Sequence, residues 1–271
     1  MKKKLVRPPA VAGVFYSADR DTLLNDIHKF LLNAEGEGEP DKVMGAISPH
    51  AGYFYSGHVA GAVFGSIAVP DRVIIIGPNH RGVGAPVALD TSGGWLFPFG
   101  IVPTDAEAFS MILDNSNFVE PDMEAHAFEH SLEVIVPFLF VRNHKVSITA
   151  ICMGTSEPEK IEDVANAVAK TARETGALVV ASTDMTHYMP DDIARKLDLA
   201  TIDAIKRMDV EGMMERVDRD GALCGGSSVA ATLMACEKNG ATRAELVRYA
   251  TSGDIENKRG SVVGYGGFRL V

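Results

Sequence analysis

The sequence predicts an α/β protein with a central parallel or mixed sheet flanked by helices on both faces. Short β-branched apolar runs alternate along the chain with segments that have helical periodicity. The 271 residues, of which 46% are hydrophobic, are enough to bury a large core. We therefore expect a single domain that spans residues 1–271.

The first predicted elements are a helix, a loop and a βαβ unit. Residues 17–21 start a helix whose apolar side chains recur on one face, and the stretch 35–40, rich in Glu and Gly, is expected to be a surface loop. A strand at 43–48, a helix at 57–67 and a strand at 72–76 follow. We expect the two strands of this βαβ unit to be neighbours in the sheet.

The rest of the chain continues the alternation. Capping boxes at 104–107 and 156–159 predict two helix starts, and the second helix runs to Gly176 between strands at 145–152 and 178–182. A helix is expected to start at 190–192, and another is expected at 227–238. Two strands, at 246–250 and 261–270, are expected to follow, separated by a turn at 252–254.

Composition limits the classes of partner. The formal net charge of −10 disfavours nucleic acids and anionic membranes, so we expect a small-molecule or peptide ligand. The chain has no apolar run of about 18 residues and no hydrophobic region of a signal peptide. Its three cysteines are Cys152, Cys224 and Cys236, an odd number at wide spacing, which suits a reducing compartment and predicts a cytoplasmic protein.

Three apolar runs lead into a histidine. His50 and His80 follow the strands of the βαβ unit through exits rich in Pro and Gly, and His187 follows the strand at 178–182. Sites in α/β proteins form at the carboxyl ends of strands. A single such histidine more often caps the sheet through a backbone hydrogen bond, but two of them in one βαβ unit predict a metal site, because imidazoles ligate iron, zinc and copper.

Asp184 and His187 supply a carboxylate and an imidazole three residues apart. In a helix this spacing places both on one face. We expect Asp184 to orient a histidine or to bind metal and His187 to transfer protons, while the alternative is that Asp184 caps the next turn. His130 is a further candidate, whereas its neighbours His126 and Glu133 are expected to cap a helix over the apolar run that follows.

Cys224 precedes the helix predicted at 227–238. Free backbone N–H groups and the helix dipole favour a thiolate there, which is a soft metal ligand or a nucleophile. Cys152 and Cys236 fall inside a strand and a helix, where we expect small buried hydrophobic residues.

Taken in order, six motifs of this chain resemble those of the Memo family, whose microbial members are called AmmeMemoRadiSam system protein B. The resemblance covers nearly the whole chain. The motifs are AGVFY at 12–16, PHAGY at 49–53, GPNH at 77–80, EHSLE at 129–133, DMTH at 184–187 and CG at 224–225. The family name also suggests a functional link to a radical-SAM protein.

The resemblance implies a fold similar to that of class III extradiol dioxygenases, non-haem iron enzymes that open catechol rings. In those enzymes two histidines and a glutamate hold the iron, and a further histidine is the acid/base. Carried over by motif, His50 and His80 would be the imidazole ligands and His187 the acid/base, with Cys224 in place of the glutamate. A thiolate is softer than a carboxylate, which favours Cu(I), Zn or a thiolate-ligated iron.

The leading expectation is therefore a protein that binds Fe(II), with Cu or Zn as alternatives, and has a redox or oxygen-dependent activity on a small substrate. His50, His80 and Cys224 would bind the metal, and His187, Asp184 and His130 would complete the site. One alternative is a thiol hydrolase or transferase in which Cys224 is the nucleophile and His187 its base. The other is a binding or scaffold protein that uses the same pocket without catalysis.

Overall fold

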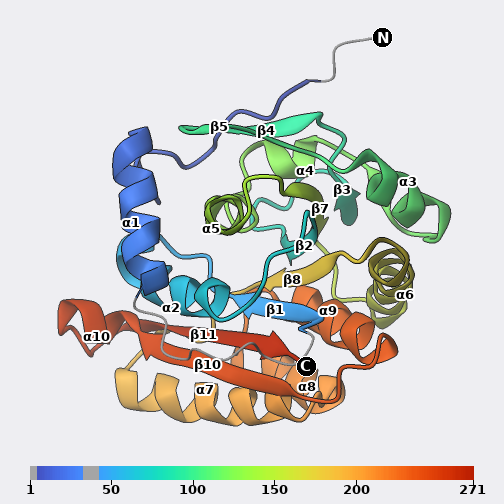
Figure 1. The fold of residues 1–271 in the computed structure, drawn as a ribbon. Helices are drawn as coiled ribbons and strands as arrows, with labels where there is room; N and C mark the ends of the chain where they lie inside the picture. The colour runs from blue at the N-terminus through green and yellow to red at the C-terminus, as the bar shows by residue number, and fades with distance from the viewer. Residues whose placement is uncertain (1–4, 33–42) are drawn as a thin grey trace.

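The computed structural model describes residues 5–32 and 43–271, and a mixed β-sheet runs through the centre of this part of the chain (Figure 1). The strands of the sheet are β1 (Gly45–Ser48), β2 (Arg72–Pro78), β3 (Val87–Leu89), β6 (Glu120–Pro121), β7 (Ser147–Met153), β8 (Leu178–Ser182), β9 (His187–Met189), β10 (Ala244–Thr251) and β11 (Val262–Leu270). Their order is β10-β11-β1-β8-β2-β7-β3-β6, with β9 paired to β11. The central strands β1, β8, β2 and β7 are parallel, so their carboxyl ends meet at one edge.

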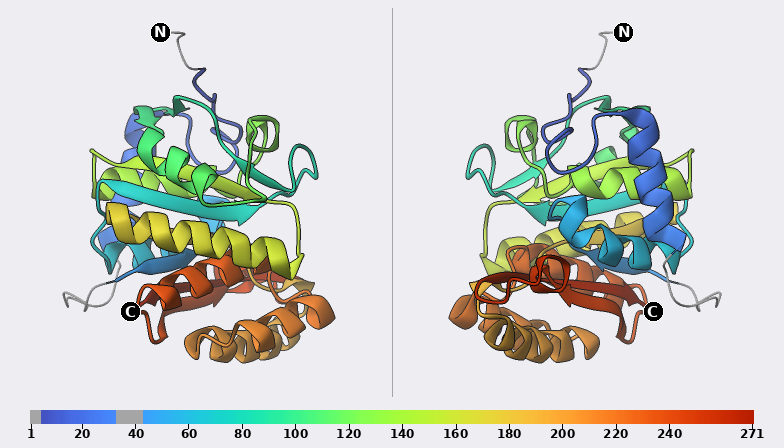
Figure 2. Two further views of the ribbon diagram at one scale, coloured as in Figure 1. Left: turned by 90° about the vertical axis from the view of Figure 1, so that its right-hand side faces the viewer. Right: turned by 90° about the vertical axis from the view of Figure 1, so that its left-hand side faces the viewer.

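Helices cover both faces of the sheet, which confirms the predicted fold class (Figure 2). The helices are α1 (Arg20–Leu32), α2 (Tyr53–Gly65), α3 (Ala106–Asp114), α4 (Glu124–Ala127), α5 (Val136–Arg142), α6 (Pro158–Thr175), α7 (Asp191–Lys206), α8 (Val210–Asp220), α9 (Gly226–Lys238) and α10 (Ser252–Glu256). Helices α1, α2 and α5 lie on one face and α6 and α9 on the other, while α7 packs on β10 and β11. A separate hairpin, β4 (Gly94–Phe97) and β5 (Gly100–Pro103), lies above the α5 side in Figure 1.

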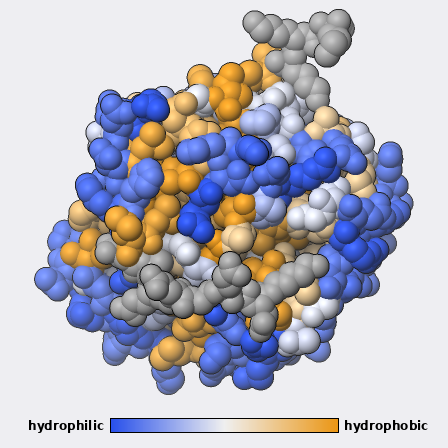
Figure 3. Space-filling view, in the orientation of Figure 1, coloured by the Kyte–Doolittle hydropathy of each residue, from blue (hydrophilic) through white to orange (hydrophobic). Residues whose placement is uncertain are grey.

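Two apolar cores form on the two faces because side chains alternate along each strand. In β2, Val73 and Ile75 belong to the core under α1, α2 and α5, whereas Ile74 and Ile76 belong to the core under α6 and α9. Figure 3 shows mostly hydrophilic residues around the edge of one face of the molecule and hydrophobic residues gathered beside α1 and nearer the centre. No helix in the described parts of the chain combines the length and apolar composition that crossing a membrane requires.

Several predicted boundaries are confirmed and others are wrong. Strand β8 has the predicted bounds, and Gly176 ends α6 with a φ of 71°, a left-handed conformation that glycine adopts readily. Helix α2 begins four residues earlier than predicted because the buried Tyr53 fixes its first turn, donating its N–H to the Phe15 carbonyl at 2.8 Å. The segment 35–40 lies outside the described residues.

The two predicted capping boxes are also wrong. The Thr104 hydroxyl donates to the Ser92 carbonyl, so Asp105 caps α3 instead. Helix α6 has no side-chain cap at its N-cap residue Glu157. The turn predicted at 252–254 is the short helix α10, which opens with a capping box formed by Thr251 and Asp254.

Candidate metal centre

Three site residues follow three adjacent strands of the sheet at the same distance. His50, Asp184 and His80 each lie two residues beyond the last residue of β1, β8 and β2. The expectation that the strands before His50 and His80 are neighbours is wrong, because β8 lies between β1 and β2. The end of β8, which leads to Asp184, therefore lies between the strand ends that lead to the two histidines.

His50 is buried, with 2% of its residue surface exposed, and its ring is oriented by a hydroxyl relay. The Ser182 hydroxyl donates to the Ser131 carbonyl at 2.6 Å, so its oxygen accepts the N–H of His50 Nδ1 at 2.8 Å. Burial, together with His80 and His130 nearby, holds the pKa of His50 well below its usual value. The imidazole is therefore neutral, and the lone pair of Nε2, on the far side of the ring from Ser182, can accept a hydrogen bond or bind a metal ion.

His80 is oriented by a carboxylate. Its Nδ1 donates to Glu129 Oε1 at 2.9 Å, and its backbone N–H donates to Glu129 Oε2 at 2.7 Å. Burial alone would raise the pKa of Glu129, but the bonds from His80 and from the Ser131 N–H lower it to about 2. Glu129 is thus an anion that fixes the tautomer of His80 and leaves Nε2 free, an arrangement common around metal-binding histidines.

Cys224 reaches the same point from the loop before α9. Gly225 permits this approach, because a Cβ at that position would lie 2.5 Å from the Ser182 carbonyl oxygen. The Asp184 N–H donates to Cys224 Sγ at 3.2 Å. Cys152 and Cys236 are buried and have no part in this cluster, as expected.

The expectation of a free thiolate at Cys224 is wrong for the metal-free protein. Burial and the neighbouring Asp184 raise the pKa of Cys224 to about 12, because these effects exceed the help from the backbone N–H donor. The thiol lies 3.3 Å from His50 Nε2, which is its nearest imidazole partner. This geometry does not supply the Cys224–His187 pair that a thiol hydrolase or transferase would use.

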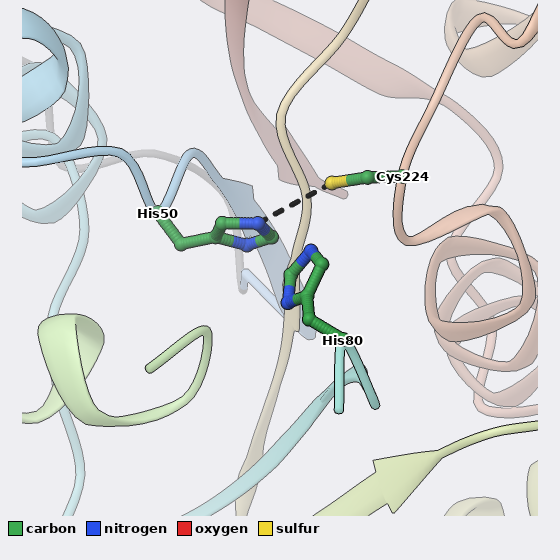
Figure 4. Close-up of side chains that lie close together, drawn as sticks. All are labelled: His50, His80 and Cys224. Carbon is green, nitrogen blue, oxygen red and sulfur yellow. Dashed lines mark hydrogen bonds between the residues drawn. The ribbon is translucent and has the colours of Figure 1, made fainter. Parts of the chain in front are cut away.

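The ligand atoms of His50, His80 and Cys224 all lie within 4.8 Å of one another. Figure 4 shows the two rings and the thiol, carried by three separate segments, directed toward one another. In a tetrahedral site with ordinary bond lengths, imidazole nitrogen and thiolate sulfur lie about 3.5 Å apart. The 3.3 Å between His50 Nε2 and Cys224 Sγ is close to that value, so the three residues fit a metal ion.

Asp184 braces the loop that carries His50. Its Oδ1 accepts the His50 backbone N–H at 2.8 Å, and its Oδ2 lies 4.0 Å from His50 Nε2. It therefore holds a neighbouring strand end and does not cap the next turn. Burial raises the pKa of Asp184 to about 7, although backbone N–H groups of His50 and Ala51 favour the ionised form. The carboxyl group can thus hold or release a proton near neutral pH.

His187 lies at the start of β9, not on a helix that it shares with Asp184. Its Nδ1 donates to the Met185 carbonyl at 2.7 Å, which leaves Nε2 free to accept a proton. Burial lowers the pKa of His187, so the ring is neutral near pH 7.

His130 stacks on His80, with ring centroids 4.7 Å apart, and lies 5.4 Å from the His50 ring. Burial lowers its pKa to about 4. His80, Glu129 and His130 form a second group with metal-ligand spacing. Glu129 Oε1 already accepts from His80 Nδ1 and from the N–H groups of His130 and Ser131, so we interpret this group as the support of His80.

Two supporting residues were missed by the sequence reasoning. Glu129 stood in a recognised motif, but nothing in its spacing linked it to a histidine 49 residues earlier. Ser182 is the last residue of β8, and its hydroxyl carries no sequence signal of its own. His126 and Glu133 are buried and cap no helix, since the 3-10 helix Glu133–Ile135 has Leu132 at its N-cap position.

Comparison with known proteins agrees with this architecture. The crystal structure of the uncharacterized protein JW3007 from Escherichia coli K12 aligns with a TM-score of 0.58 and 12% identity, covering 83% of this chain and 99% of that one. It therefore shares the fold.

Relatives at higher identity cover almost the whole chain. A MEMO1 family protein of Methanothermobacter thermautotrophicus is 41% identical over 96% of this chain and 99% of its own. One from Archaeoglobus fulgidus is 42% identical over 97% and 98%. The family model described as Memo-like protein matches residues 7–269. The chain therefore belongs to the Memo-like protein family.

Proposed function

We propose that this protein binds a metal ion, Fe(II) in the first place, through His50, His80 and Cys224 and uses it in a redox or oxygen-dependent reaction on a small molecule. The observation that carries the proposal is the convergence of three donor atoms within 4.8 Å. Both imidazoles have their Nδ1 bonded to an acceptor, so two Nε2 lone pairs and one sulfur remain for the ion.

The donor set narrows the choice of metal. Two neutral imidazoles and one thiolate suit iron, copper and zinc and do not suit magnesium or calcium, which prefer oxygen ligands. Three protein ligands leave room for a further ligand, as catalytic metal sites require. A redox-active ion bound there would supply electron transfer or activation of oxygen.

The residues around the ligands would handle protons. His187 Nε2 is free to accept a proton, and Asp184 can exchange one near neutral pH. The side chains of His80 and His130 are 30% and 18% exposed, against 2% for His50. A small molecule would therefore reach the ion from the side of His80 and His130.

Metal analysis of protein purified without oxygen tests the proposal. We expect about one ion per chain in the wild type and a loss of most of it in His50→Ala, His80→Ala and Cys224→Ser. His28→Ala removes an exposed imidazole of α1 and is the matched control, which should retain the ion. Equal metal content in the wild type and in His50→Ala would refute the ligand assignment.

A further inference from the structure

A buried arginine ties the start of the described chain to the loop that supports His80. We call residues 7–16 the N-terminal arm. Arg7 is 2% exposed, and its guanidinium lies 4.2 Å from the ring centroid of Trp95. Its Nε donates to the His126 carbonyl and its Nη2 to the Glu129 carbonyl, both at 2.7 Å. The side chain thus bonds directly to the backbone of the residue that orients His80.

Glu133 fastens the rest of the arm. Its Oε2 lies 2.6 Å from Arg7 Nη1 and also accepts the Ala10 N–H at 2.8 Å. Its Oε1 accepts the Val11 N–H and the Tyr16 hydroxyl. Burying two charges costs free energy that their mutual attraction does not reliably offset, so the Arg7–Glu133 pair is not explained by stability alone.

The far end of the arm contacts the other side of the metal centre. The Phe15 carbonyl accepts the Tyr53 N–H at 2.8 Å, just beyond the loop that carries His50. The Phe15 ring lies 4.8 Å from the ring of His130. The N-terminal arm therefore spans from the loop after β1 to the segment that contains Glu129.

We propose that Arg7 is a positioning residue of the metal centre: it holds Glu129 in the place from which the carboxylate orients His80, so that docking of the N-terminal arm and metal binding stabilise each other. This inference rests on the proposed function, because it concerns the affinity of that same site. The coupling is reciprocal, since a site that binds metal better with the arm docked must hold the arm better with metal bound.

Arg7→Lys separates charge from geometry. Lysine keeps the positive charge opposite Glu133, but it has no planar fork and cannot donate in three directions to the two carbonyls and the carboxylate. Loss of a partner that supports a ligand typically lowers metal affinity by about 10- to 100-fold. Arg7 bonds to the backbone of Glu129 and not to His80 itself. We therefore expect a loss of metal affinity at the lower end of this range, on the order of tenfold.

Competition titration with Zn²⁺ and a chelator measures this loss. The matched control is Arg72→Lys. Arg72 is the first residue of β2 and pairs with Glu107 of α3, so it lies at the end of the strand opposite to His80. We expect weaker binding in Arg7→Lys and unchanged binding in the control. Equal Zn²⁺ affinity in the wild type and in Arg7→Lys would refute the role of Arg7, whereas a wild type that binds no metal would refute the proposed function itself.

A second measurement needs no variant and so does not depend on whether Arg7→Lys folds. The N–H groups of Ala10 and Val11 are bonded to Glu133 only while the arm is docked. Hydrogen exchange of these amides should slow when Zn²⁺ is added to the wild type. Unchanged exchange under saturating Zn²⁺ would show that the arm and the site are not coupled.

Discussion

Metal binding should release one proton from Cys224, and the structure gives the reason. In the metal-free protein, burial and Asp184 raise the pKa of this thiol to about 12, so it is protonated at neutral pH. Burial holds the pKa of His50 well below its usual value, so this imidazole has no proton to lose. A metal ion that takes Cys224 as a thiolate must therefore displace the proton of the thiol.

The size of the effect follows from this competition. A proton competes with the metal for sulfur, so raising the pH weakens the competitor and strengthens binding. Apparent affinity should rise about tenfold per pH unit as long as the pH stays below the pKa of the thiol. Between about pH 8 and pH 9 this proton is separated from that of Asp184, whose pKa burial raises to about 7.

Calorimetric titration with Zn²⁺ in buffers of different ionisation enthalpy counts the released protons. We expect about one proton per ion in the wild type, and in Cys224→Ser much weaker binding without this proton, because a serine hydroxyl does not ionise in this range. Tight binding in the wild type without proton release would mean that Cys224 is already a thiolate or is not a ligand, and either result would refute the reasoning.

Further predictions concern the residues that support the ligands. Glu129→Gln keeps an acceptor for His80 but removes the charge, and it should weaken Zn²⁺ binding by about 10- to 100-fold in competition titrations; unchanged affinity would contradict the orienting role. The lowered pKa of Glu129 also stabilises the folded protein at pH values above 4.5, the ordinary pKa of a glutamate, so the free energy of unfolding should fall as the pH drops from about 4.5 to 2. Denaturant unfolding at several pH values should show a smaller fall in Glu129→Gln. Gly225→Ala places a Cβ 2.5 Å from the Ser182 carbonyl oxygen and should lower both metal affinity and melting temperature, while Gly260→Ala, with open space around it, should change neither.

The fold could be predicted where local chemistry alone decides it. The β-branched run in β2 and the helix end at Gly176 both follow from local preferences. Helix α8 was missed although Val210, Met213, Met214 and Val217 repeat at helical spacing and pack on the core, a pattern from which a helix could have been predicted. The prediction of a capping box at 104–107 was wrong because it assumed that the Thr104 hydroxyl caps the helix, whereas this hydroxyl donates to the Ser92 carbonyl.

The three residues of the cluster could be predicted from the sequence, but their arrangement and their supporting residues could not. Strand ends rich in Pro and Gly identified His50 and His80, and a cysteine before a helix identified Cys224. The insertion of β8 between β1 and β2 depends on pairing between distant segments, which no local pattern encodes. The pKa of Cys224 could not be inferred either, because the dipole argument ignores how deeply the loop is buried.

The two proposed imidazole ligands are not equivalent, because they differ in exposure and in the group that binds Nδ1. His50 is buried, and its Nδ1 bonds to a neutral hydroxyl, whereas His80 is partly exposed, and its Nδ1 bonds to an anionic carboxylate. A carboxylate partner makes an imidazole the more basic donor. His80 therefore combines the stronger donor with the open side of the site. His130 and the Glu129 carbonyl that accepts from Arg7 lie on the same side. The N-terminal arm therefore supports His80, the more exposed of the two imidazoles.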